Sequence, residues 1–258
     1  MHEVDLLASE NITPYLLEVQ HEYETTLFGE IKQTVFQNLD IALGSRLTYL
    51  NSTAKIYPQP LLRINYVIND QWKLKSAFSK SIQAVRELTV ENRFGREIEF
   101  LALSQPEAGY PVLRADKYMI GGNYTSGKIY IDAEFYYKKT DGLIAVRALK
   151  PDPSFPDASS PEDLYRFFTG DGRTAGLDIM AVIKNKNSET SISYTLRKME
   201  QRYERLFNGN YFSPKEDRRH QVKLSSQYQF GKFTASGLLA YKTEASYISL
   251  IRLGPGEI

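Results

Sequence analysis

The sequence has 258 residues, a formal net charge of +1 and 42% hydrophobic residues, enough for one or two folded domains. Its near-neutral charge gives no reason to expect a nucleic-acid or acidic-lipid surface. It contains no Cys, which excludes disulfides, thiolate catalysis and Cys-ligated metal. The 18 Tyr and 13 Phe favour β structure.

No part of the sequence is a transmembrane helix, which needs roughly 18–20 uninterrupted apolar residues. The segment Met1–Asp5 lacks the basic and apolar regions of a signal peptide. Barrels cross membranes on short strands of alternating apolar and polar residues, so the lack of a transmembrane helix does not exclude a membrane barrel.

Alternation of apolar and polar residues, repeated in pairs, predicts a series of β-hairpins. The first pair is expected over about 14–28 and 35–50, with its turn near Phe28-Gly29-Glu30. Four clearer hairpins follow it. Their turns are Asn69-Asp70, Thr125-Ser126-Gly127, Asn185-Lys186-Asn187 and Gly231-Lys232. Gly142 is expected to form a bulge or turn within a long strand. The predicted fold is all-β, an antiparallel meander of about ten strands.

The two faces of these strands differ in polarity. One face of the four clear hairpins carries no charged residue, as in either a soluble sandwich or a membrane barrel. The opposite face is polar, and its candidate lumen-facing residues are Arg63, Lys73, Lys75, Lys117, Asp132 and Glu134. Such residues can guide a polar substrate or contact a plug. The alternative is that they only line a water-filled barrel interior.

Three features favour part of a transmembrane β-barrel. Aromatic rings such as Trp72 and Tyr124 gather beside the short turns, as at a lipid–water boundary. Short turns alternate with long polar connections, predicted at about 83–113, 148–172 and 198–218. The run 128–147 is also longer than a typical globular strand.

Several short motifs resemble the barrel region of TonB-dependent receptors of the Bacteroidetes type, in order over about residues 35–243. They are Gly44-Ser45-Arg46, Pro60 to Tyr66, Leu74 to Ser81, Tyr118 to Tyr124, Glu134 to Lys139, Gly176-Leu177-Asp178, Ser193-Tyr194-Thr195 and Asp217 to His220.

The resemblance implies an outer-membrane receptor or transporter for ferric siderophores, cobalamin, glycans or peptides, without a cofactor. Family barrels have about 22 strands and enclose a separate plug. Residues 1–258 show no signal peptide, plug, TonB box or terminal aromatic strand, so we expect a partial barrel domain. The implied partners are outer-membrane lipid, the nutrient ligand, a surface lipoprotein and, through the plug of the parent protein, the TonB complex; nucleic acid is not among them.

Aromatic residues in the long connections are candidate extracellular ligand contacts, because flat apolar rings stack on sugars or siderophores. These residues are Tyr165, Phe167, Phe168, Phe207, Tyr211 and Phe212. They can equally pack the loops against one another.

Two other function classes remain open. One is a soluble antiparallel β protein that binds a ligand through its loops. The other is a small outer-membrane barrel hydrolase that uses His220 with Asp217, the one His–carboxylate pair close in sequence. The plain reading of His220 is a polar residue at a strand end. The sequence therefore predicts a transport barrel and no catalytic residues.

Overall fold

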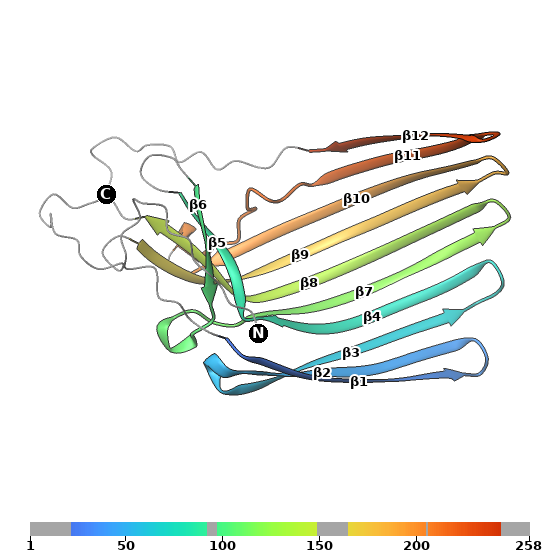
Figure 1. Ribbon diagram of the computed structural model, residues 1–258. Helices are drawn as coiled ribbons and strands as arrows, with labels where there is room; N and C mark the ends of the chain where they lie inside the picture. Colours follow the sequence, from blue (N-terminus) through green and yellow to red (C-terminus); the bar gives the residue numbers. More distant parts are fainter. Residues whose placement is uncertain (1–21, 92–96, 149–164, 205, 244–258) are drawn as a thin grey trace, which may run out of the picture.

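A computed structural model describes residues 22–91, 97–148, 165–204 and 206–243. Ten strands form one antiparallel sheet in the order β1-β2-β3-β4-β7-β8-β9-β10-β11-β12, and β5 pairs with β6 separately (Figure 1). No helix among these residues is long or apolar enough to span a membrane. The strands are β1 Glu24–Val35, β2 Leu39–Leu50, β3 Lys55–Val67, β4 Trp72–Gln83, β5 Val85–Glu91, β6 Glu97–Leu103, β7 Leu113–Ser126, β8 Ile129–Ala148, β9 Tyr165–Lys184, β10 Ser188–Tyr203, β11 His220–Phe230 and β12 Phe233–Lys242.

The alternating sequence pattern produces one apolar and one polar face. Antiparallel partners project to the same side of a sheet, so the register decides which residues share a face. One continuous row consists of Leu43, Leu62, Phe78, Tyr118 and Tyr137. We call the side bearing this row the apolar face and the other side the polar face. The predicted all-β meander is confirmed.

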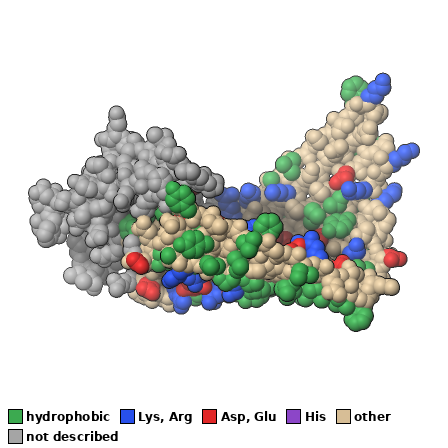
Figure 2. Space-filling view, turned by 60° about the horizontal axis from the view of Figure 1, so that its bottom comes forward, with side chains coloured by type: hydrophobic (Ala, Val, Ile, Leu, Met, Phe, Trp, Pro, Cys, Tyr) green, Lys and Arg blue, Asp and Glu red, His purple; other side chains and the backbone are tan. Residues whose placement is uncertain are grey.

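The apolar face is largely uncovered. Leu27 is 71% exposed, Ile120 62% and Leu239 69%, although each would normally be buried in a soluble protein. The sheet is hollowed in the space-filling view, and charged side chains gather around the hollow (Figure 2). An apolar outer surface around a polar hollow is the arrangement of a membrane barrel wall.

The short turns lie together at one end of the sheet, which we call the turn end (Figure 1). Three of the four clear turns lie where they are predicted, and the one predicted at Thr125-Ser126-Gly127 lies at Gly127-Lys128, because β7 continues through Ser126. Asn69 shows why: its Oδ1 accepts the N–H groups of Gln71 at 2.9 Å and Trp72 at 2.8 Å. The predicted turn near Phe28-Gly29-Glu30 is wrong, because β1 continues through it. The chain turns instead at Phe36 and Gln37, whose φ angles are 54° and 64°.

The opposite end, the loop end, contains more strand than the sequence predicts. The predicted connection 83–113 contains hairpin β5–β6, while β9 already begins at Tyr165 and β10 continues to Tyr203. These segments lie beyond the apolar rows, so neither face has to be hydrophobic and the alternation disappears. The bulge predicted at Gly142 is confirmed by a register shift between Asp141 and Leu143 and by a φ of 82°.

Candidate functional site

The polar face contains a cluster of charges centred on Lys75. Its Nζ lies 2.7 and 2.9 Å from the two carboxylate oxygens of Asp132, and it also donates to Glu134. The Tyr130 hydroxyl donates to Asp132 Oδ2 at 3.1 Å. The Lys75 and Asp132 side chains are 21% and 13% exposed, so the pair is partly screened from solvent. The cluster therefore ties β4 to β8, two strands away.

Gly121 on β7 makes this contact possible. It pairs with Lys75 on one side and Glu134 on the other, so it lies directly between them. A Cβ there would meet the backbone carbonyl of Ala133 and lie 3.1 Å from Glu134 Cγ. The missing side chain leaves room for the Glu134 side chain, whose carboxylate meets Lys75 across the strand.

A second ion-pair group repeats this arrangement near the first strand. Glu30 on β1 pairs with Arg63 on β3 and, at 3.0 Å, with Lys32. Between them Gly44 on β2 faces the Glu30 side chain, and a Cβ at Gly44 would lie 3.4 Å from Glu30 Cβ and Cγ. On the polar face, side chains of β4 and β8 thus meet across Gly121 of β7, and side chains of β1 and β3 meet beside Gly44 of β2.

Of the other predicted polar-face residues, Arg63 belongs to the Glu30 group, and Lys73 and Lys117 belong to neither group. Lys117 Nζ lies 5.4 Å from the ring centre of Tyr136, and Lys73 has no ion pair among the described residues. Of the six predicted residues, the structure brings together only Lys75, Asp132 and Glu134.

A shallow pocket of about 380 Å³ lies on the polar face over β1–β3. Its lining residues are Lys32, Gln33, Thr34, Asp40, Ile41, Ala42, Arg63 and Asn65. Cations, a carboxylate and amides border the same space, so the surface suits a polar solute rather than an apolar one.

At the loop end, Tyr211 is held between two arginines. The guanidinium carbons of Arg173 and Arg202 lie 4.2 and 4.8 Å from its ring centre. Its hydroxyl donates to Asp171, which also forms an ion pair of 2.7 Å with Arg202. The ring is thus used within the protein and anchors the β10–β11 connection.

These contacts shift the titration of both partners. Burial alone would raise the pKa of the Asp171 carboxyl, but hydrogen bonds from Tyr211 and Arg202 outweigh it and lower that pKa. The hydrogen bond to Asp171 is the main reason that the pKa of Tyr211 is raised. The charged form of Asp171 is therefore stabilised.

Other predicted loop rings also pack within the protein. The Phe212 ring centre lies 4.5 Å from that of Phe207 and 6.0 Å from that of Tyr203. Burial raises the pKa of Tyr203 to about 12. Phe167 lies 5.0 Å from Tyr110, centre to centre. The alternative that the rings pack the loops together describes Phe167, Phe207, Tyr211 and Phe212.

Three of the predicted rings, Tyr165, Phe167 and Phe168, lie in β9 rather than in a connection. Phe168 pairs with Ala145 and Tyr165 with Ala148. The side chain of Tyr165 lies outside the described residues.

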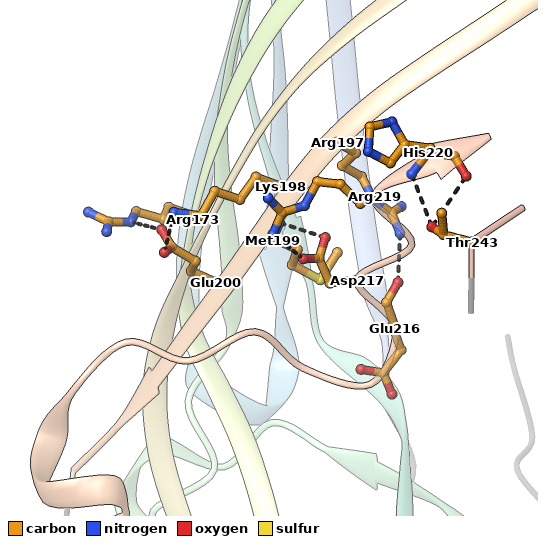
Figure 3. A network of polar contacts seen from close by, with 10 residues as sticks. All are labelled: Arg173, Arg197, Lys198, Met199, Glu200, Glu216, Asp217, Arg219, His220 and Thr243. Atoms are coloured by element: carbon orange, nitrogen blue, oxygen red, sulfur yellow. Dashed lines mark hydrogen bonds and ion pairs between the residues drawn. The ribbon is translucent and has the colours of Figure 1, made fainter. Parts of the chain in front are cut away.

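The β10–β11 connection also covers the free edge of β10. The pairing of β10 with β11 ends at Leu196. Beyond this residue, the Met199 N–H donates to Asp217 Oδ1 at 2.9 Å (Figure 3). The Gln201 N–H donates to the Phe212 carbonyl at 2.8 Å, and Phe212 returns the bond at 2.9 Å. Arg219 lies 3.2 Å from Asp217, which is 3% exposed. Covering an edge in this way prevents pairing with other chains.

His220 and Asp217 do not form a catalytic pair. His220 Nδ1 is hydrogen-bonded to the Tyr194 hydroxyl at 2.8 Å, and its backbone N–H donates to Thr243 Oγ1 at 3.1 Å. Asp217 is occupied by Met199 and Arg219. The reading of His220 as a polar strand-end residue agrees with this geometry.

Hairpin β5–β6 crosses the strands at the loop end (Figure 1). It is held by the buried Arg86, which donates to the backbone carbonyls of Gly142 and Pro111. Beside it a hollow of about 670 Å³ is bordered by polar and apolar side chains, Arg86, Tyr203 and Glu216 among them. Residues of β5 thus form one wall of this hollow.

Residues that the sequence-based prediction missed include Glu30, Lys32, Tyr130 and Arg86. The wrong turn near residue 29 hid Glu30, although continued alternation from Leu27 would place it on the polar face. No group of three His, Asp or Glu suited to a metal occurs in the described part of the chain.

Comparison with known proteins agrees with this architecture. The family model described as TonB dependent receptor-like, beta-barrel, matches residues 8–254. The chain belongs to this family. TonB-dependent receptors are outer-membrane transporters and receptors rather than enzymes, so the apolar face contacts lipid and the polar face the lumen. By the asymmetry of such barrels the turn end is periplasmic and the loop end extracellular.

Solved structures share the fold at low sequence identity. The FrpB iron transporter from Neisseria meningitidis is 11% identical with a TM-score of 0.54, over 82% of this chain and 31% of that one. The copper transporter OprC is 13% identical with a TM-score of 0.59, over 85% and 34%. The ferripyoverdine receptor of Pseudomonas aeruginosa is 12% identical with a TM-score of 0.54, over 87% and 32%. The chain thus spans about a third of these proteins. No curated protein matches it.

Proposed function

We propose that this chain forms part of the wall of an outer-membrane transporter that imports a nutrient with energy delivered through TonB. The observation that carries the proposal is the pairing of two unlike faces in one ten-stranded meander. One face presents uncovered apolar side chains, and the other holds the Lys75 and Glu30 charge groups.

The polar face supports a role in guiding a polar solute or docking a plug. The Lys75 group, the Glu30 group and the pocket beside Arg63 are all on this face. Candidate solutes are ferric siderophores, cobalamin, glycans and peptides. The neighbours named for iron, copper and ferripyoverdine support a metal-bearing solute among these.

Uptake in cells tests the proposal. The parent protein that contains this chain, with its plug, would be expressed in a strain that lacks its own siderophore receptors, with and without a functional TonB. We expect it in the outer-membrane fraction, and we expect TonB-dependent accumulation of one labelled ferric siderophore. Recovery in the outer membrane without accumulation of any solute of the four classes would contradict transport.

We infer that the chain has no catalytic role. The inference is supported by the contacts of His220 and Asp217, which engage Tyr194 and Met199 rather than one another. If hydrolysis of ester or peptide substrates appeared and vanished in His220→Ala, the hydrolase reading would replace this one.

The soluble alternative is separated by behaviour in solution. A membrane wall with residues such as Ile120 exposed should need detergent or lipid. A monodisperse, folded sample in plain buffer would contradict the membrane assignment.

A further inference from the structure

The sheet is interrupted between β3 and β4. From the turn end, these strands pair only as far as Leu61 and Ser79, although both continue toward the loop end. Beyond that point β3 remains paired with β2, and β4 remains paired with β7. We call the unpaired stretch, residues 55–60 of β3 and 80–83 of β4, the seam.

Two prolines explain where the pairing ends. In an antiparallel sheet, alternate residues of a strand bond to opposite neighbours. The Val67 N–H donates toward β2 and the Ile68 N–H toward β4, so the even-numbered residues of β3 bond to β4. Pro58 and Pro60 occupy two of these even positions and have no N–H to donate. The ladder between β3 and β4 therefore loses two successive donors.

A side chain bridges the seam in place of the backbone. The Ile82 N–H, which a continued ladder would bond to the Pro58 carbonyl, donates to Gln59 Oε1 at 3.3 Å. Gln59 Nε2 donates to Thr48 Oγ1 on β2 at 2.8 Å, and that hydroxyl lies 3.1 Å from the Thr26 hydroxyl on β1. One glutamine amide thus connects β4 to the block formed by β1, β2 and β3.

Rings and apolar side chains pack beside this bridge. Tyr57 is 8% exposed and belongs to a buried cluster with Leu50, Ala84 and Val112. The guanidinium carbon of Arg114 on β7 lies 5.6 Å from the centre of the Tyr57 ring. Side chains therefore hold the seam closed, and such contacts can separate locally without unfolding of the strands on either side.

The seam lies where an opening is tolerated. It begins directly beyond Phe78, which belongs to the continuous apolar row, so it lies at the extracellular edge of the lipid-facing surface. Unpaired backbone groups are costly in lipid hydrocarbon, but water can satisfy them above it.

We propose that the barrel wall opens at the seam, with Gln59 as the latch, and that this opening widens the extracellular mouth for an entering solute. The block β1–β3 then moves away from β4 at the loop end, while the paired part between Leu61 and Val67 stays closed. The role in uptake rests on the proposed transport function. The opening itself does not depend on it.

The test is amide hydrogen exchange in the parent protein that contains this chain, in detergent micelles. A zipped variant, P58T with P60T, restores the two missing donors of the ladder. Its matched control, P106T with P214T, removes two prolines outside the seam. A latch variant, Q59L, removes the acceptor of the Ile82 amide and leaves the prolines in place.

In the wild type, the Ile82 amide should exchange at least about tenfold faster than the amide of Ser76, which lies within the paired part of β4. Exchange at Ile82 should slow about tenfold in the zipped variant, stay unchanged in the proline control and become faster in Q59L. The opening is overturned if Ile82 exchanges as slowly as Ser76 in the wild type, or if the zipped variant and the proline control exchange alike. If the zipped variant misfolds, unchanged exchange at Ile82 in Q59L would equally overturn the latch.

Uptake in cells tests the role of the opening. The zipped variant should bind the solute at the cell surface as the wild type does and accumulate it several-fold more slowly. Equal accumulation in the zipped variant and the proline control would overturn this role. If the wild type itself accumulates no solute, the proposed transport function fails and the role in uptake with it, whereas hydrogen exchange still decides whether the seam opens.

Discussion

Lys75 and Asp132 meet at 2.7 Å although β7 lies between their strands and 57 positions separate them in sequence. Gly121, the β7 residue that pairs with both Lys75 and Glu134, places no side chain in the way of this crossing. Glu30 and Arg63 meet across β2 beside Gly44. Polar contacts on this face thus connect second-neighbour strands, which strand pairing alone does not join.

Replacing Lys75 by Met should lower the free energy of unfolding by about 1–2 kcal/mol, because Asp132 and Glu134 would lose their cation. Urea unfolding in micelles can be followed by Trp72, the single Trp, whose ring centre lies 4.7 Å from that of Tyr124. The control is Lys73→Met on the same strand and face, which removes no described ion pair. Equal losses in both variants would contradict the stabilising role of the cluster.

Replacing Gly121 by Ala should cost about 1–3 kcal/mol, since the new Cβ meets the Ala133 carbonyl and forces the sheet to shift. Gly237→Ala is the control, because nothing lies within 4 Å of a Cβ there. Its stability should change by less than about 0.5 kcal/mol. If Gly121→Ala unfolds at the same urea concentration as Gly237→Ala, the glycine is not needed for the crossing.

Acid should loosen the β10–β11 connection through Asp171. An unfolded Asp titrates near pH 4 or just below, and the hydrogen bonds from Tyr211 and Arg202 lower the folded pKa. The stabilisation is therefore complete above the unfolded pKa and is lost as pH falls through the folded pKa.

The measurement is limited proteolysis of the connection as a function of pH, in the wild type and in Asp171→Asn. At pH 7 the variant should be cleaved several-fold faster, as expected when a charge-assisted contact is lost. The two proteins should converge in acid. A rate ratio that does not change with pH would show that the charge of Asp171 contributes nothing.

Removing the Asp217 carboxylate should expose the upper edge of β10. In Asp217→Ala the Met199 N–H loses its acceptor, so its hydrogen exchange should become about tenfold faster. The control is Glu216→Ala, because Arg197 bonds the backbone carbonyl of Glu216 at 2.7 Å and not its side chain (Figure 3). Unchanged exchange at Met199 in Asp217→Ala would mean that another acceptor holds this amide.

Alternation predicted the clear hairpins because a half-buried strand needs one apolar residue in two. The turn at Asn69-Asp70 was predictable because the Asn side chain bonds its own following backbone. The first turn was mispredicted because Gly29 suggested a turn, whereas the chain bends at Phe36 and Gln37 with positive φ angles that their residue types do not indicate.

The sequence by itself determined the strands, their two faces and the membership of Lys75, Asp132 and Glu134 in the polar one. Only the tertiary structure decided which of these residues meet, because the contact depends on the register of three strands and on the gap at Gly121. It also decided how the loop end is built. There both faces of the strands lie beyond the apolar rows. Tyr211 and Asp171 are joined by a hydrogen bond, and such contacts leave no apolar–polar alternation in the sequence.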